Sequence, residues 1–82
     1  MKDTMTIFRR IIGYIARINN YNMPKIEHVA QDMEIDIADL RVWLHLMESL
    51  GLVSVSDDGQ RVSLNLWSLD RFGFDTNKLK DL

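Results

Sequence analysis

The chain has 82 residues, of which 46% are apolar and 27% charged, a composition typical of one small globular domain rather than of a disordered segment. It contains no cysteine, which excludes disulfides, zinc–thiolate sites and thiol nucleophiles. A domain of this size buries only about 60% of the surface that its unfolded chain exposes, so we expect it to depend on oligomerisation or on very close packing.

Charge is distributed unevenly along the chain, although the net charge is only −2. Residues 1–26 carry five basic side chains and one acidic one, a net charge of +4. Residues 27–58 carry one basic and eight acidic side chains (net −7), and residues 59–82 carry four basic and three acidic ones (net +1). The middle of the chain should therefore present a negative surface to any partner.

Apolar residues recur at helical spacing over residues 4–19, which predicts the first helix. Phe8 and Ile12 widen its apolar surface beyond a single stripe, so we expect this helix to bury two faces. Arg10 and Arg17 lie on its far side. They either contact phosphate or a partner's acids, or simply face solvent.

The second helix is predicted over residues 24–33, with Pro24 at its first helical position. Asp36 is expected to cap a third helix over residues 37–50, and Gly51 to end it. The core-facing stripe of this third helix is Leu40, Trp43, Leu44, Met47 and Leu50. Its outward face is Ala38, Arg41, Val42, His45 and Ser49.

Alternating apolar and polar residues predict two strands, over residues 52–56 and 61–66. The Asp58-Gly59 pair between them favours a hairpin with a type I′ turn. The fold class is therefore mainly α with a small β-hairpin. The expected pairs across the hairpin are Val53 with Leu64 and Val55 with Val62.

A C-terminal tail, residues 67–82, follows the hairpin and contains three aromatic residues. These aromatics either cover the domain's own core against the first helix, or dock on a second copy or another partner. The residues expected at a dimer or partner contact are Phe8, Ile12, Trp67, Phe72 and Phe74.

Neither catalysis nor metal binding is indicated. His28 and His45 are the two histidines of the chain, and there is no nucleophile elbow or phosphate-binding glycine loop. Residues 1–6 are polar, and arginines interrupt the apolar run after them, so neither a secretion signal nor a membrane helix is predicted. We expect a cytoplasmic protein that is not an enzyme, without cofactor, metal or small-molecule substrate.

The pattern of residues 24–66 resembles the winged helix-turn-helix superfamily of transcription regulators. The residues that carry the resemblance are Pro24, Ala30 on the inner side of the second helix, the Glu34-Ile35-Asp36 turn, and Ser49-Leu50-Gly51-Leu52-Val53 before the hairpin, or wing. With the first helix (residues 1–20) included, the resemblance covers about four fifths of a single domain.

The resemblance implies a DNA-binding transcription regulator that acts as a dimer, with the third helix in the major groove and the wing on the DNA backbone. The implied contact residues are Lys25, Ala38, Arg41, Val42, His45, Ser49, Gln60 and Arg61. The wing tip, usually basic in the superfamily, is Asp57-Asp58 here, and Glu34 adds another acid. We therefore expect double-stranded DNA to be bound weakly and in a salt-sensitive manner.

The alternative is a protein-interaction or assembly module that does not bind DNA. Winged helices also serve as protein-docking domains, and the acidic face of residues 27–58 would suit a basic protein partner. The resemblance alone does not choose between the two functions.

Overall fold

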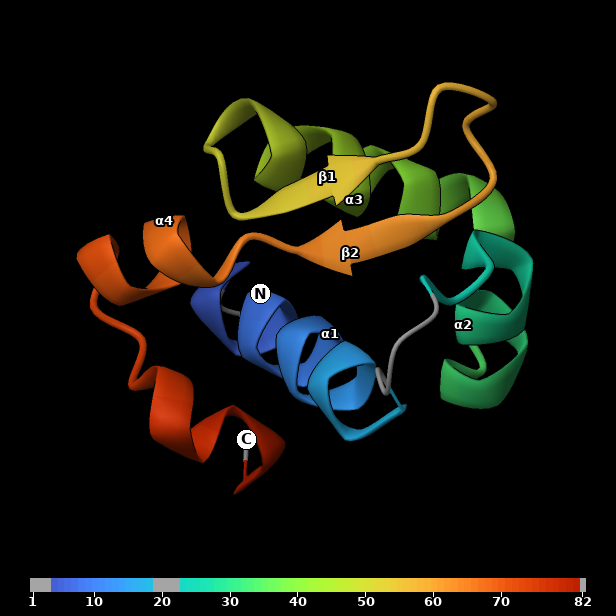
Figure 1. The fold of residues 1–82 in the computed structure, drawn as a ribbon. Helices are drawn as coiled ribbons and strands as arrows, with labels where there is room; N and C mark the ends of the chain where they lie inside the picture. The colour runs from blue at the N-terminus through green and yellow to red at the C-terminus, as the bar shows by residue number, and fades with distance from the viewer. Residues whose placement is uncertain (1–3, 19–22, 82) are drawn as a thin grey trace.

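The computed structural model describes residues 4–18 and 23–81, and the fold is mainly helical with a small antiparallel sheet (Figure 1). This confirms the predicted combination of helices with one hairpin. The elements in chain order are α1 (Thr4–Ile18), α2 (Ile26–Met33), α3 (Ile37–Ser49), β1 (Val53–Val55), β2 (Val62–Leu64), α4 (Leu66–Arg71) and the 3₁₀ helix η1 (Thr76–Asp81). The predicted end of the first helix, Asn19, lies outside the described residues. None of the described helices has the length and apolar character that a membrane crossing requires.

Local signals set both ends of α3, as expected. The Asp36 carboxylate accepts hydrogen bonds from the backbone amides of Ala38 (2.8 Å) and Asp39 (3.4 Å), which would otherwise lack partners in the first turn. At the other end, Gly51 has a φ of +79°, a left-handed conformation that commonly follows a helix. The helix stops just before Leu50, which is 45% exposed instead of lying in the core stripe as predicted.

The start of α2 is later than predicted, because the segment before it pairs with the hairpin. The Val62 amide donates to the Pro24 carbonyl (3.1 Å), and the Ile26 amide donates to the Gln60 carbonyl (2.8 Å). Between these two bonds, Lys25 has extended backbone angles (φ −74°, ψ 134°). Pro24 therefore lies in a short extended segment beside β2 and is not the first residue of the helix.

The hairpin has the predicted register, in which Val53 faces Leu64 and Val55 faces Val62. Apolar side chains thus lie opposite each other across both pairs, as the alternation of the sequence requires. Its strands are shorter than expected, and Leu66 belongs to α4 rather than to the second strand.

The hairpin loop does not form the predicted type I′ turn. That turn needs a positive φ at both Asp58 and Gly59, and of the two only Gly59 has one (+72°). The Gly59 amide donates to the Ser56 carbonyl (2.8 Å), which closes the loop one residue earlier than predicted. The Asp58 carboxylate accepts hydrogen bonds from the Ser56 hydroxyl and the Gln60 amide, and these bonds stabilise the observed conformation.

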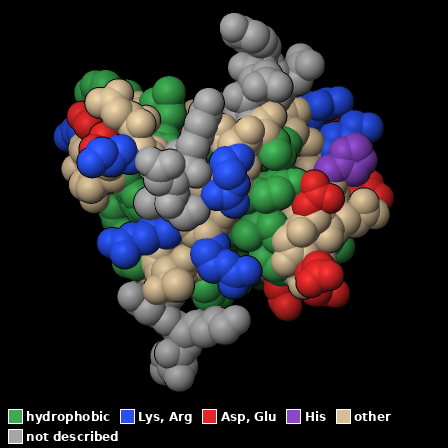
Figure 2. All heavy atoms as spheres, turned by 90° about the horizontal axis from the view of Figure 1, so that it is seen from below, with side chains coloured by type: hydrophobic (Ala, Val, Ile, Leu, Met, Phe, Trp, Pro, Cys, Tyr) green, Lys and Arg blue, Asp and Glu red, His purple; other side chains and the backbone are tan. Residues whose placement is uncertain are grey.

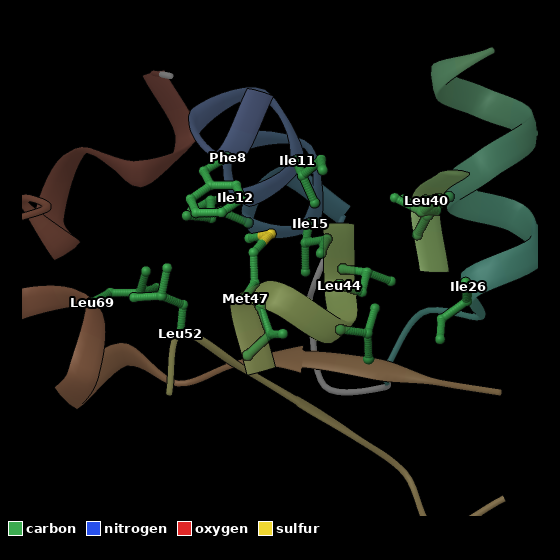
Figure 3. Packing of buried hydrophobic residues seen from close by; sticks show 14 of the residues in the cluster. Phe8, Ile11, Ile12, Ile15, Ile26, Leu40, Leu44, Met47, Leu52 and Leu69 are labelled. Carbon is green, nitrogen blue, oxygen red and sulfur yellow. The ribbon is translucent and has the colours of Figure 1, made fainter. Parts of the chain in front are cut away.

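The core lies between α1 and α3, whose apolar side chains point toward one another (Figure 3). The hairpin closes it on one side, and η1, which follows α4, folds back along α1 on another (Figure 1). The buried residues of α1 and α3 are Phe8, Ile11, Ile12, Ile15, Ala16, Leu40, Leu44 and Met47. The C-terminal segment contributes Leu69, Phe74 and Leu79.

Three residues expected at a dimer or partner contact lie in this core instead. Phe8 is 2% exposed, Ile12 is 0% exposed and Phe74 is 7% exposed, so their contacts are made within the chain. Trp67 (69% exposed) and Phe72 (45% exposed) remain at the surface. The C-terminal segment therefore covers the domain's own core and also leaves two aromatic rings open to a partner.

Candidate nucleic-acid interface

The outward face of α3 is exposed as predicted. Its residues follow one another at helical spacing, so they share the side of the helix opposite to the buried stripe. All five predicted members of this face are exposed, namely Ala38, Arg41, Val42, His45 and Ser49.

Arg41 joins α3 to the hairpin loop. Its Nη1 atom donates a hydrogen bond to the Gly59 carbonyl (2.9 Å). Arg41 and His45 line a cleft of about 290 Å³ between the helix and the hairpin. The remaining lining residues of this cleft are Ile26, Leu44, Glu48, Val55 and Gly59. The two side chains predicted to contact bases thus lie together at the edge of a concave surface.

The remainder of the exposed face of α3 is more apolar than the sequence predicts. Val42 is 67% exposed, and Leu46 (41%) and Leu50 (45%) follow it at intervals of four residues. The Ser49 hydroxyl donates to the Leu46 carbonyl (2.7 Å), so it is engaged within the helix. Because side chains four residues apart are neighbours on a helix, Val42, Leu46 and Leu50 form an exposed apolar stripe. Leu46 is not among the residues predicted on this face, although its spacing of four residues from Val42 indicates that it belongs there.

Lys25 and Arg61 lie directly opposite each other in the pairing between residues 24–26 and β2. The backbone hydrogen bonds from Val62 to Pro24 and from Ile26 to Gln60 flank this pair. The two side chains therefore lie close together on the same face of the sheet. Both side chains are exposed, and Arg61 Nη1 also donates to the Met23 carbonyl (2.7 Å). The fold therefore brings together two predicted phosphate contacts that are 36 residues apart in the sequence.

Acidic groups border this basic pair. The Asp58 carboxylate has a pKa below its usual value, because it accepts hydrogen bonds from the Ser56 hydroxyl and the Gln60 amide and lies near the Arg61 charge. The Glu48 carboxylate, which lines the cleft with Arg41 and His45, accepts a hydrogen bond from the Val55 amide (3.1 Å). Asp58 therefore reduces the positive potential near Arg61, and Glu48 reduces it in the cleft.

Arg10 and Arg17 lie beside a different cleft, of about 390 Å³, between α1 and α2. Asp32 and Glu34 line the same cleft, and the Tyr14 hydroxyl donates a hydrogen bond to the Asp32 carboxylate. Burial and this bond raise the pKa of Tyr14 to about 12. Figure 2 shows the face that contains α1: most of its acidic side chains lie on one side, while basic ones lie in the centre, on the opposite side and also beside the histidine at the upper right. Because acids of the same chain surround them, these arginines suit phosphate less well than Lys25 and Arg61 do.

Within residues 4–18 and 23–81, no group of three or more histidine and carboxylate side chains could hold a metal ion. Comparison with models of known protein families, with curated proteins and with solved structures finds no match for this chain.

Proposed function

We propose that the protein is a small winged-helix DNA-binding protein that regulates transcription as a dimer. The observation that carries the proposal is the juxtaposition of Lys25 with Arg61, next to the cleft that holds Arg41 and His45. Lys25 and Arg61 together form a basic edge beside the wing loop, and Arg41 reaches the same loop through its hydrogen bond to Gly59. Cationic side chains at such an edge can neutralise phosphates, which supply most of the affinity of non-specific DNA binding.

The order of the elements supports a winged-helix assignment. A helix, a short extended segment, two more helices and a hairpin follow one another, and the extended segment pairs with the second strand of that hairpin. In this arrangement α3 is the recognition helix and the hairpin is the wing.

The exposed residues of α3 and the residues beside the wing would make different contacts with DNA. Arg41 and His45 lie on the exposed face of α3, where they would meet base edges in the major groove. Lys25 and Arg61, which lie side by side, would bind neighbouring phosphates at the wing, with Gln60 beside them. The hydrogen bond from Arg41 to Gly59 holds the wing against α3, so the helix and the wing would approach DNA as one unit. The proposal requires binding alone and assigns no catalytic residue.

Binding by one copy should be weak, because Asp58 lies near Arg61, Asp57 precedes it in the wing loop, and Glu48 lines the cleft with Arg41. A dimer would bring two weak half-sites onto the same DNA, and linked sites bind far more tightly than either does alone. This is the physical reason for proposing that the protein acts as a dimer.

A second candidate function is an assembly module that binds a basic protein rather than DNA. The apolar stripe of Val42, Leu46 and Leu50 favours it, because a helix face that reads bases is usually polar. The net charge of −7 over residues 27–58 points in the same direction.

Titration of the protein into a fluorescent random-sequence DNA duplex, followed by anisotropy, tests the two functions against each other. On random-sequence DNA Arg41 has no specific base to read, so it is counted with Lys25 and Arg61 as a phosphate contact. Three such contacts predict a slope of about −2.7 in a plot of log affinity against log salt. The affinity should therefore fall roughly 40-fold between about 50 and 200 mM salt. An absence of binding even at the lower salt concentration would contradict DNA binding and favour the assembly module.

A further inference from the structure

Helix α4 presents a tryptophan that the domain's own core does not use. Trp67 is 69% exposed, although tryptophan is among the side chains that gain most from burial. The Arg71 guanidinium carbon lies 4.7 Å from the centre of the Trp67 ring, a cation–π contact that restrains both side chains. Asp70 is also exposed. Because these three residues are spaced i, i+3 and i+4, they lie on the same side of the helix, and we call them the α4 knob.

A cleft of about 250 Å³ lies between α1 and α3, away from the hairpin. Its walls are mainly apolar, and its two charged residues, Arg10 and Asp39, have opposite signs. The lining residues are Ile7, Arg10, Ile11, Met33, Ile35, Asp39 and Trp43. Pockets for drug-sized ligands measure roughly 300–1,000 Å³, so this cleft is better suited to one large side chain than to a small molecule.

We propose that the α4 knob of one copy of this chain docks into the α1–α3 cleft of a second copy. Trp67 would fill the apolar part of the cleft, with Asp70 facing Arg10 and Arg71 facing Asp39. The two surfaces thus match in apolar character and in both charges, which is why a second copy is a better occupant than an unrelated partner. Trp and Arg are also the residue types most enriched among the residues that dominate binding energy at protein interfaces.

The knob and the cleft occupy different parts of the molecule. The cleft is bounded by the end of α2 and the turn after it, and α2 and α4 lie at opposite ends of the fold (Figure 1). A single copy therefore cannot fill its own cleft, and each contact uses different surfaces on the two copies. Such a heterologous contact leaves one knob and one cleft unoccupied in a dimer, so further copies can add head to tail.

This association does not depend on DNA binding, because it uses neither Lys25, Arg61 nor the outward face of α3. A contact centred on one side chain is small compared with the roughly 1,200–2,000 Å² of a stable interface, so it should be weak and reversible. On DNA, head-to-tail neighbours would occupy sites in the same orientation, as direct repeats rather than as a palindrome.

Sedimentation velocity without DNA, over a range of protein concentrations, tests the proposal. The mean mass of the wild type should rise continuously with concentration instead of stopping at a dimer. Trp67→Ala should weaken the self-association at least about tenfold. Leu66→Ala is the matched control, since it also removes an exposed apolar side chain from α4 (54% exposed) but leaves the knob intact. Far-UV circular dichroism should show that both variants remain folded.

Charge reversal tests the pairing of specific residues. Arg10→Glu and Asp70→Lys should each weaken the association, because each places like charges opposite each other, whereas the double variant should restore it. A mixture provides the sharpest test: Trp67→Ala keeps an intact cleft, and Arg10→Glu keeps an intact knob. Together they should form a one-to-one dimer that grows no further, although each alone remains mainly monomeric.

Three results would overturn the proposal. These are a wild type that stays monomeric up to millimolar concentration, a Trp67→Ala variant that associates like the wild type, and a mixture that forms no dimer. The last result would indicate a symmetric contact, in which both variants damage the same surface. None of these measurements includes DNA. A negative result would therefore refute the head-to-tail contact without bearing on the proposed DNA-binding function.

Discussion

Replacing Lys25 and Arg61 together by glutamine is expected to weaken binding to random-sequence DNA by more than about 100-fold at low salt. Hydrogen bonds to charged groups contribute about 1.5–3 kcal/mol each, so the loss of two should cost about 3 kcal/mol or more. The slope of log affinity against log salt should fall from about −2.7 to about −0.9, because one phosphate contact remains. Anisotropy titration at several salt concentrations measures both quantities.

The fold should tolerate this double substitution. The two side chains are exposed and lie opposite each other in the bridge, and like charges at such positions destabilise a sheet. Arg9→Gln with Lys78→Gln is a matched control, because it removes two exposed positive charges on α1 and η1, outside the proposed interface. If the control lost as much affinity as the Lys25/Arg61 variant, binding would follow from overall charge, and the proposed interface would be wrong.

Phe8→Ala is expected to destabilise the folded monomer by about 3–5 kcal/mol. The Phe8 ring is 2% exposed and packs edge-on against Trp43, with ring centres 6.2 Å apart. A domain of this length has a total stability of roughly 4–12 kcal/mol, so the substitution should remove a large part of it. Urea unfolding followed by circular dichroism measures the loss, and Phe8→Leu serves as a milder variant if the alanine variant does not fold.

The comparison with Trp67→Ala separates a core residue from a surface one. Trp67 contributes little to the domain's own core, so its removal should cost less than about 1 kcal/mol, mainly from the contact with Arg71. In the Trp67→Ala background, which removes the proposed contact of α4 with a second copy, the unfolding midpoint of Phe8→Ala should not depend on protein concentration. A small loss of stability, or an unfolding midpoint that shifts with protein concentration in that background, would indicate that Phe8 contacts a second copy.

The features that local sequence determines were predicted correctly. The Asp36 cap, the outward face of α3 and the hairpin register each depend on residues close together in the chain. A capping carboxylate needs amides two and three residues ahead, and helical or alternating periodicity appears within one element. These signals were sufficient to place Arg41, Val42 and His45 on one exposed face.

The predictions that failed depend on contacts between distant parts of the chain. The start of α2 is set by pairing with β2, which the local preference of Pro24 for a first helical position does not reveal. The same long-range pairing brings Lys25 beside Arg61. In the hairpin loop, the hydrogen bonds that the Asp58 carboxylate accepts stabilise the observed turn. The Asp58-Gly59 pair alone is compatible with both this turn and a type I′ turn.

The sequence also predicts only part of how the wide apolar surface of α1 is buried. Its periodicity shows that Phe8 and Ile12 must be buried, but not which surface buries them. In the structure the C-terminal segment covers α1, through residues such as Phe74 and Leu79, so no second copy is required there.

The measurement that tests the proposed interface most directly is a nuclear magnetic resonance titration of the ¹⁵N-labelled protein with a short DNA duplex at low salt. On a duplex short enough to hold a single copy, the proposal predicts that the amide signals of Lys25, Arg41, His45 and Arg61 shift together as DNA is added, while those of α4 remain in place. Shifts confined to α1 around Arg10 and Arg17, or no shifts at all with excess DNA, would contradict it.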